Sequence, residues 1–156
     1  MFCAGKVVSH LDIYHYFMDQ RLTFITLGVT DLSVSRKFYE EIFGWKPDPS
    51  SSGDVVFFKL NGIMLSLFPR EELANDAEVS SKGSGFRPFS LAYNVRSEQE
   101  VDDIVSDLKL KGVIVLKTPQ KAFWGGYTSY VADPDGNLWE IAYNPFIRLD
   151  DSGNVM

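Results

Sequence analysis

The chain has 156 residues, of which 45% are hydrophobic and 14% aromatic, enough to bury the core of one domain or of two small modules that share a sheet. Its 21 acidic and 15 basic residues give a formal net charge of −6. This charge opposes the phosphate neutralisation that nucleic-acid binding needs, so we expect no nucleic-acid partner. The single cysteine, Cys3, cannot form an internal disulfide, and we expect a cytoplasmic location.

Residues 1–20 are expected to form an N-terminal extension outside the folded part of the chain. Their apolar residues are interrupted by His10, Asp12 and His15, so the segment lacks the continuous apolar centre of a signal peptide. No apolar run in the chain is long enough to span a bilayer. The sequence therefore predicts no membrane partner.

Residues 21–79 are predicted to form a first module. The stretch "RLTFITLGV" alternates as a half-buried strand, and "SVSRKFYEEIFG" predicts a serine-capped amphipathic helix with Val34, Phe38 and Ile42 as its buried stripe. The stretches "VVFFKL" and "IMLSLF" follow as a hairpin, because the Asn-Gly pair between them tolerates the positive φ angles of a two-residue turn. This order corresponds to a βαβββ unit.

A small, polar and glycine-rich segment at 80–88 predicts a linker, and beyond it the order of elements repeats. Residues 89–147 are predicted to form a strand, a helix and three more strands, and a C-terminal tail, 148–156, follows. The second helix opens with a capping box, "SEQE". The sequence therefore predicts an α+β protein built from two similar modules.

Two of these stretches, "LGVTDLSVSRKFYEEIFGW" and "DPDGNLWEIAYNP", together resemble the vicinal oxygen chelate superfamily, which includes glyoxalase I, bleomycin resistance proteins and extradiol dioxygenases. The resemblance covers the chain from Leu22 to Pro145. It implies that each βαβββ module curls into a U-shaped mixed sheet and that the two modules surround a central cavity. It also implies a homodimer, because proteins of this family often pair their modules across chains.

Metal-dependent members of this family hold a divalent ion with one ligand from each of four strands. The resemblance places these positions on Phe24, Leu65 with Ser66 beside it, Ser90 and Glu140. Only Glu140 is a usual metal ligand, and the side chains of phenylalanine and leucine cannot coordinate a metal. We therefore expect no cofactor and no catalytic metal.

Glu140 lies in the middle of an otherwise apolar last strand. Alternation places Trp139 and Ile141 against the helices, so Glu140 is expected to point to the concave side. Three roles stay open for it: a solvated or arginine-paired carboxylate, recognition of a donor or cation on a ligand, and general-base catalysis with a raised pKa. The predicted small-molecule pocket is lined by Phe24, Thr26, Leu65, Ser90, Asn94, Trp124, Tyr127, Glu140 and Asn144.

Two loops of the second module carry further expectations. The stretch "AFWGGY", residues 122–127, is either a mobile aromatic lid hinged at its glycines or a tight connection whose tryptophan fills the core. The stretch "DPDG" has the chemistry of a turn. Its carboxylates, Asp133 and Asp135, are expected to be exposed and to need no functional explanation.

These observations favour a glyoxalase-like or bleomycin-resistance-like protein that binds a small organic molecule in the cavity between its modules without a catalytic metal. The negative charge suits a neutral or cationic ligand. The alternative is a lyase or isomerase resembling glyoxalase I (lactoylglutathione lyase), which uses a metal or Glu140 as its base. A third interpretation is a pocket closed by Phe24 and Leu65 in a chain that acts only through protein contacts.

Overall fold

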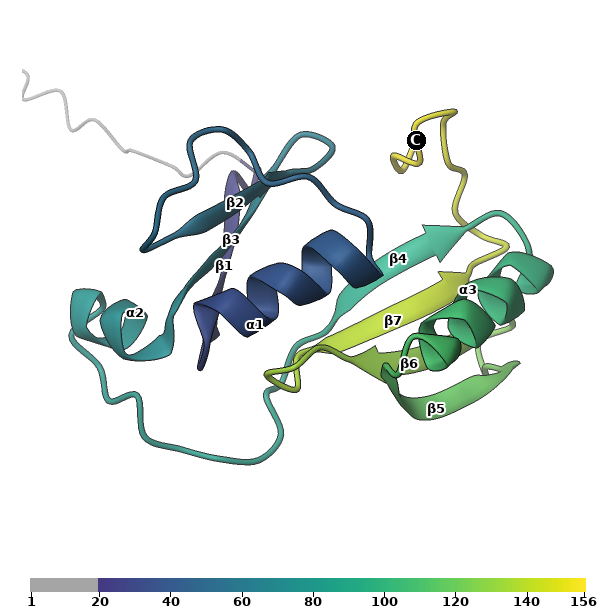
Figure 1. Cartoon of the computed structure of the whole chain (residues 1–156). Helices are drawn as coiled ribbons and strands as arrows, with labels where there is room; N and C mark the ends of the chain where they lie inside the picture. Colours follow the sequence, from purple (N-terminus) through teal and green to yellow (C-terminus); the bar gives the residue numbers. More distant parts are fainter. Residues whose placement is uncertain (1–19) are drawn as a thin grey trace, which may run out of the picture.

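The structure, a computed structural model, describes residues 20–156 as two β-sheets with helices α1 and α3 on the same side of both (Figure 1). The strands are β1 (Phe24–Val29), β2 (Val56–Lys59), β3 (Met64–Pro69), β4 (Leu91–Val95), β5 (Ile114–Lys121), β6 (Tyr127–Ala132) and β7 (Leu138–Tyr143). The helices are α1 (Leu32–Lys37), continued by the π-helical turn η1 (Phe38–Ile42), α2 (Arg70–Asp76) and α3 (Glu98–Leu110). The predicted α+β fold is confirmed. None of the helices between residues 20 and 156 has the length and apolar character that crossing a bilayer requires.

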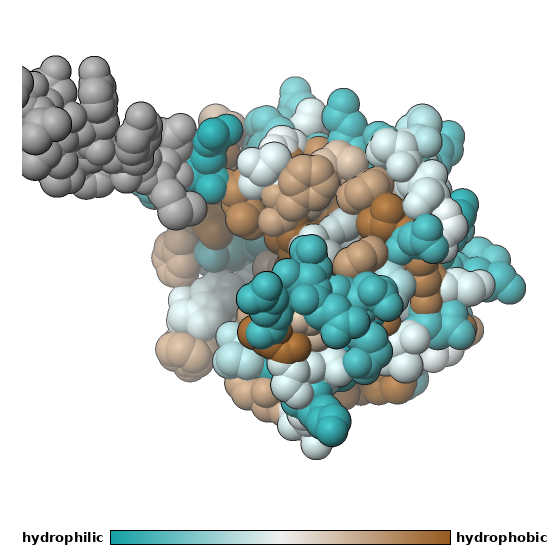
Figure 2. Space-filling model, turned by 90° about the vertical axis from the view of Figure 1, so that its left-hand side faces the viewer, coloured by the Kyte–Doolittle hydropathy of each residue, from teal (hydrophilic) through white to brown (hydrophobic). Residues whose placement is uncertain are grey.

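The first sheet has three strands in the described chain, in the order β1-β3-β2, with β1 parallel to β3 and β2 antiparallel to it. A βαβββ module has four strands, but here the chain enters α2 directly after β3. The sequence "REELAND" favours this helix, because it combines good helix formers with acidic residues in the first turn. Helix α2 packs against β1 at Gly28, where a β-carbon would lie 3.2 Å from the Leu73 side chain. Its charged surface lies nearest the viewer in Figure 2.

The second sheet has the order β4-β7-β6-β5 and completes the predicted βαβββ unit. Ser97 caps α3 and accepts a hydrogen bond from the amide of Glu100 at 3.2 Å. The Glu100 carboxylate accepts from the amide of Arg96 at 2.9 Å, one residue before the position that a capping box predicts. The buried stripe of α3 includes Val101 and Val105, so this helix is oriented as its apolar spacing indicates.

Helix α1 differs from its prediction in its cap and in its buried face. Asp31 caps it, and its Oδ1 accepts from the amides of Ser33 at 2.9 Å and of Val34 at 3.0 Å. Val34 is 50% exposed, whereas Ser35 and Tyr39 are fully buried. The predicted stripe is therefore wrong at Val34, because the polar side chains of Ser35 and Tyr39 find partners in the second module. Phe38 and Ile42 are half-buried and pack against the core, so this part of the stripe is confirmed.

The larger of two core clusters joins the two modules on the helix side of the sheets. The ring of Tyr39 stacks on Trp45, with centroids 5.5 Å apart, and the indole Nε1 of Trp139 donates to the Tyr39 hydroxyl at 3.2 Å. The other buried members of this cluster are Leu27, Val29, Val56, Phe58, Leu65, Leu67, Leu108, Val113 and Val131. The opposite faces of both sheets therefore point away from the shared core.

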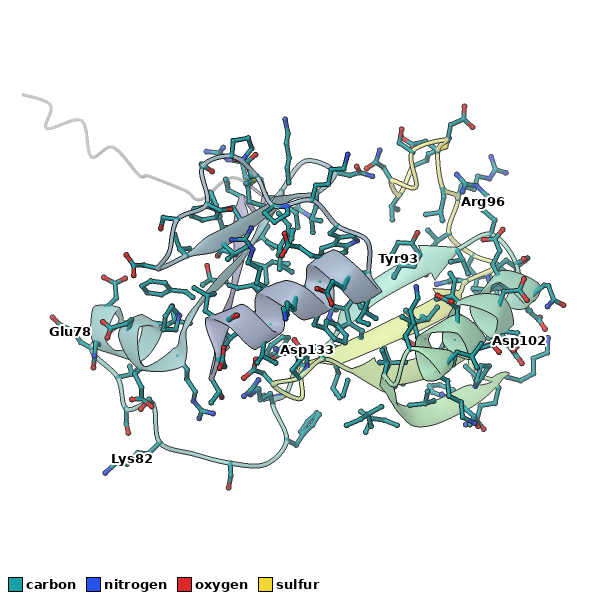
Figure 3. All side chains as sticks on the ribbon, in the orientation of Figure 1. Glu78, Lys82, Tyr93, Arg96, Asp102 and Asp133 are labelled. Carbon is teal, nitrogen blue, oxygen red and sulfur yellow. The ribbon has the colours of Figure 1, made fainter. Side chains whose placement is uncertain are left out.

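The turn at 133–137 holds the two modules together (Figure 3). Asp133 is 2% exposed and accepts a hydrogen bond from the Tyr39 hydroxyl at 2.7 Å. Asp135 accepts from the amide of Thr30 at 2.7 Å and from the hydroxyl of Ser35 at 2.6 Å. The expectation that these two carboxylates are exposed and local is therefore wrong, because their partners lie in the first module, far away in the sequence.

The tail contains a second turn of the same five-residue pattern, Asp-x-x-Gly-Asn, at 150–154. Asp150 Oδ1 accepts from the amides of Ser152 and Asn154 at 2.9 and 2.8 Å, as Asp133 Oδ1 does within its own turn. The carbonyl of Ser152 accepts from the side chain of Asn61, between β2 and β3, at 2.8 Å. Arg96, labelled in Figure 3, donates to the carbonyl of Asp150. The tail thereby connects the first module to the second.

Candidate functional site

The open face of the first sheet carries Phe24, Thr26, Phe57 and Ser66. The Thr26 and Ser66 hydroxyls lie 2.6 Å apart, and the Phe24 ring meets Phe57 edge-on at 6.1 Å between centroids. Phe24 is 48% exposed. Leu65 is fully buried in the core instead, so its predicted place in the pocket is wrong, because a displacement of one residue moves a strand side chain to the other face.

The open face of the second sheet contains Glu140 in a row of paired residues. Strand pairing places Ala92, Glu140, Tyr130 and Lys117 next to one another across β4, β7, β6 and β5. Glu140 is half-buried, and its neighbour Trp139 is 4% exposed on the helix side. Alternation therefore predicted the direction of the glutamate correctly.

A pocket of about 520 Å³ opens on this face beside Tyr130. Its volume lies within the usual range for small-molecule sites. The walls combine five apolar side chains with two hydroxyls and one ammonium group: Phe86, Pro88, Phe89, Ser90, Leu116, Lys117, Tyr130 and Leu138. Of the predicted site residues, Ser90 lines this pocket, and Glu140 lies next to it through Tyr130.

The Tyr130 hydroxyl sits between two polar groups. Burial raises the pKa of Tyr130, the charge and hydrogen bonding of Glu140 raise it further, and hydrogen bonding from Ser90 lowers it. Tyr130 is therefore neutral at physiological pH and keeps its proton for hydrogen bonding. In the β6–β7 hairpin, residues equally distant from the 133–137 turn lie opposite each other, and this pairs Tyr130 with Glu140. The position of the turn in the sequence was therefore a signal that could have identified Tyr130.

Lys117 is the cation of the pocket, and the sequence analysis missed it. Its ammonium donates to the hydroxyl of Thr128 at 2.8 Å and lies 5.6 Å from the centre of the Tyr130 ring. The register of β5 shifts between Val115 and Lys117. Simple alternation along this strand therefore assigns the wrong face, because a bulge interrupts the two-residue period.

Phe24, Thr26 and Leu65 belong to the first sheet, and four further predicted site residues, in the second module, also lie away from this pocket. The Tyr127 hydroxyl donates to Asp102 of α3 at 2.9 Å, which places Tyr127 on the helix side. Asn94 lines a separate groove beside the C-terminal tail, and Asn144 accepts from the amide of Phe146 at 3.0 Å at the end of β7. The Trp124 ring covers Gly126 at the tip of the β5–β6 hairpin, so it neither fills the core nor lines this pocket.

The residues at the four family metal positions do not fit a divalent ion. On the open faces these positions present the phenyl ring of Phe24, the hydroxyls of Ser66 and Ser90, and the carboxylate of Glu140. A divalent ion is usually held by three or more imidazole, thiolate or carboxylate ligands. Residues 20–156 contain no cluster of three such side chains that could hold a metal.

Comparisons with known proteins agree with this architecture. The profile of the Glyoxalase/Bleomycin resistance protein/Dioxygenase superfamily matches residues 21–141. The chain is 29% identical over 145 residues to a virulence protein of Salmonella typhimurium, covering 89% of this chain and 94% of that protein. It is 30% identical over 131 residues to a lactoylglutathione lyase of Arabidopsis thaliana, covering 79% of this chain and 44% of the plant protein. The crystal structure of a glyoxalase-related enzyme from Fulvimarina pelagi matches with a TM-score of 0.79 and 37% identity, covering 88% of this chain and 97% of that chain.

Proposed function

Because the chain belongs to the glyoxalase/bleomycin resistance protein/dioxygenase superfamily, we propose that it binds a small organic molecule on the open face of its second sheet. The observation that carries this proposal is the pocket of about 520 Å³. Its wall is mostly apolar, and Ser90, Lys117 and Tyr130 provide a few fixed polar groups, which is the usual composition of a small-molecule site.

Binding without a catalytic metal is part of the proposal. It is supported by the side chains at the four family positions, of which Glu140 alone is a carboxylate. Glu140 instead lies beside the Tyr130 hydroxyl and raises its pKa after the larger effect of burial. In this arrangement the carboxylate orients the tyrosine at the pocket wall.

A second copy of the chain is proposed to cover the pocket. In one chain the pocket rim is open, since Phe86 is 80% exposed, and small-molecule sites normally bury most of their ligand. The open face of the first sheet carries the aromatic rings of Phe24 and Phe57, which are apolar like the wall of the pocket. A homodimer that pairs these two faces would enclose the ligand and bury the exposed aromatic rings.

A ligand screen with one blocking variant tests the proposal. Hits from a small fragment library are identified on the wild-type chain by saturation-transfer NMR. Ser90→Trp fills the pocket from its exposed wall, and Gln99→Trp places the same side chain on the exposed side of α3 as a control. We expect the hits to lose their signal with Ser90→Trp and to keep it with Gln99→Trp. Hits that bind both variants equally would refute a site on this face.

A further inference from the structure

We propose that this pocket recognises a small apolar carboxylate, with the carboxylate at Lys117 and the apolar body against the aromatic wall. The inference rests on the proposed binding function and specifies its ligand class. It differs from the expectation drawn from net charge, which favours a neutral or cationic ligand.

Lys117 has hydrogen-bonding capacity that the described chain does not use. An ammonium group has three donors, and the Lys117 ammonium makes one hydrogen bond within the described chain, to the Thr128 hydroxyl at 2.8 Å. Thr128 itself is buried, so the ammonium is held against the sheet instead of extending into solvent. The donors that remain on this ammonium are available to a bound carboxylate.

Some surface cations in the described chain have acidic partners. Lys121, on the same strand, pairs with Glu98, and Lys111 pairs with Asp107 at 2.7 Å. Lys117 forms no ion pair with any residue in 20–156. An anion that pairs with Lys117 therefore has to come from outside the described residues.

The carboxylate of Glu140 opposes an anion but lies farther away. Two strand spacings separate Glu140 from Lys117 across Tyr130, which corresponds to about 10 Å between their backbones. Coulomb interactions fall with distance, so an anion in contact with the ammonium gains more from Lys117 than it loses to Glu140. Glu140 also interacts with the Tyr130 hydroxyl, which disperses its charge.

The remaining wall suits the apolar part of such a ligand. Phe89, Leu116 and Leu138 present rings and aliphatic groups to the pocket. The site therefore provides an apolar wall, an ammonium and a hydroxyl within one pocket.

Three naphthalene probes of matched shape test this inference: 2-naphthoate, neutral 2-naphthalenemethanol and cationic 2-naphthylmethylammonium. Their dissociation constants are measured by NMR titration on the full chain at low and high salt. We expect the carboxylate to bind wild type about tenfold more tightly than the alcohol, with the preference shrinking at high salt, and the cation to bind most weakly.

Variants of two lysines on β5 test whether the preference for the carboxylate over the alcohol comes from Lys117. Lys117→Met keeps the aliphatic stem and removes the charge, so the carboxylate should bind no better than the alcohol, whose affinity stays unchanged. Lys121→Met removes a charge outside the pocket and should leave the tenfold preference intact. Lys117→Arg keeps the charge and should retain most of the preference.

The outcomes separate this inference from the binding function. Equal affinities for the three probes, a preference for the cation, or an unchanged preference in Lys117→Met would overturn the carboxylate assignment and leave the binding function standing. The same conclusion follows if no probe binds while fragment hits still respond to Ser90→Trp. If no probe binds and no hit responds to that variant, both proposals fail.

Discussion

The hydroxyl of Tyr39 and the carboxylate of Asp133 form a 2.7 Å hydrogen bond that connects the first helix to the β6–β7 turn, with both side chains buried. Burial raises the pKa of Tyr39 far above its ordinary value, and the charge and hydrogen bond of Asp133 raise it further. The modules of the chain thus meet through a polar pair inside an aromatic core.

Removing this hydroxyl should destabilise the protein. Tyr39→Phe leaves the buried Asp133 carboxylate with one partner fewer, so we expect a loss of about 1–3 kcal/mol in the free energy of unfolding, measured by urea denaturation. Tyr143→Phe, at a half-buried tyrosine on β7, is the matched control and should change stability by less than about 0.5 kcal/mol. Equal effects of the two substitutions would contradict a special role for the Tyr39–Asp133 pair.

The same pair predicts a pH dependence. The folded pKa of Tyr39 is raised, so its stabilising effect is complete below the unfolded pKa of about 10 and is lost as the pH rises above that value. Wild type should therefore lose about 1.4 kcal/mol more than Tyr39→Phe for each pH unit above 10. Urea denaturation of both proteins at pH 8 and pH 11 measures the difference. If the difference in unfolding free energy between wild type and Tyr39→Phe is as large at pH 11 as at pH 8, Tyr39 ionises freely in the folded protein.

Adjacent residues of β7 should respond differently to substitution. Trp139→Ala removes a buried ring from the shared core and should destabilise the fold by about 3–5 kcal/mol. Glu140→Gln conserves volume on the open face and should leave the melting temperature nearly unchanged, while it removes the charge that opposes 2-naphthoate and so tightens its binding. Thermal unfolding and probe titration of both variants provide the readouts. A large loss of stability in Glu140→Gln with an intact Trp139→Ala would mean that the two faces of the strand have been interchanged.

Divalent metals should not stabilise the chain. A ligand raises the melting temperature only if the native state contains a site for it, and the family positions carry Phe24, Ser66 and Ser90 beside Glu140. Differential scanning fluorimetry should give the same melting temperature with micromolar nickel, zinc or ferrous iron as with EDTA, which serves as the control. A metal-dependent rise of several degrees would revive the lyase alternative.

The proposed homodimer depends on Phe24. Light scattering of wild type should give a mass near twice the 17.6 kDa of one chain, and Phe24→Glu should shift it toward the monomer by placing a charge in the apolar cover. Lys37→Glu, on the exposed side of α1, changes charge without touching that face and should remain dimeric. A monomeric wild type at high micromolar concentration would rule out a stable second-copy cover.

Alternation along the sequence was informative where a strand has one polar and one apolar face. It oriented β7 correctly, because Trp139 and Ile141 flank a single carboxylate. On β3 the predicted pocket residue came from the family spacing, which points to Leu65 with Ser66 beside it. Leu65 lies in the core and the Ser66 hydroxyl bonds to Thr26 on the open face, so this assignment was off by one residue.

Two other errors came from contacts that local patterns do not encode. Asp133 looked like an exposed turn residue because its partner Tyr39 lies 94 positions earlier in the chain. Lys117 was missed because a register shift in β5 breaks the two-residue period just before it. The buried position of Asp133 and the pocket position of Lys117 can be assigned only when the pairing of distant segments is known.

The shared core and the two Asp-x-x-Gly-Asn turns have a consequence for cutting the chain. Both turns belong to the second half and bind the first, through Thr30 and Ser35 at one turn and Asn61 at the other. The exposed linker at 80–88, by contrast, adds little to the buried core that joins the halves. Cleavage within that linker would therefore yield two fragments that remain associated, and the protein could be supplied as two separate polypeptides whose reassembly restores the fold.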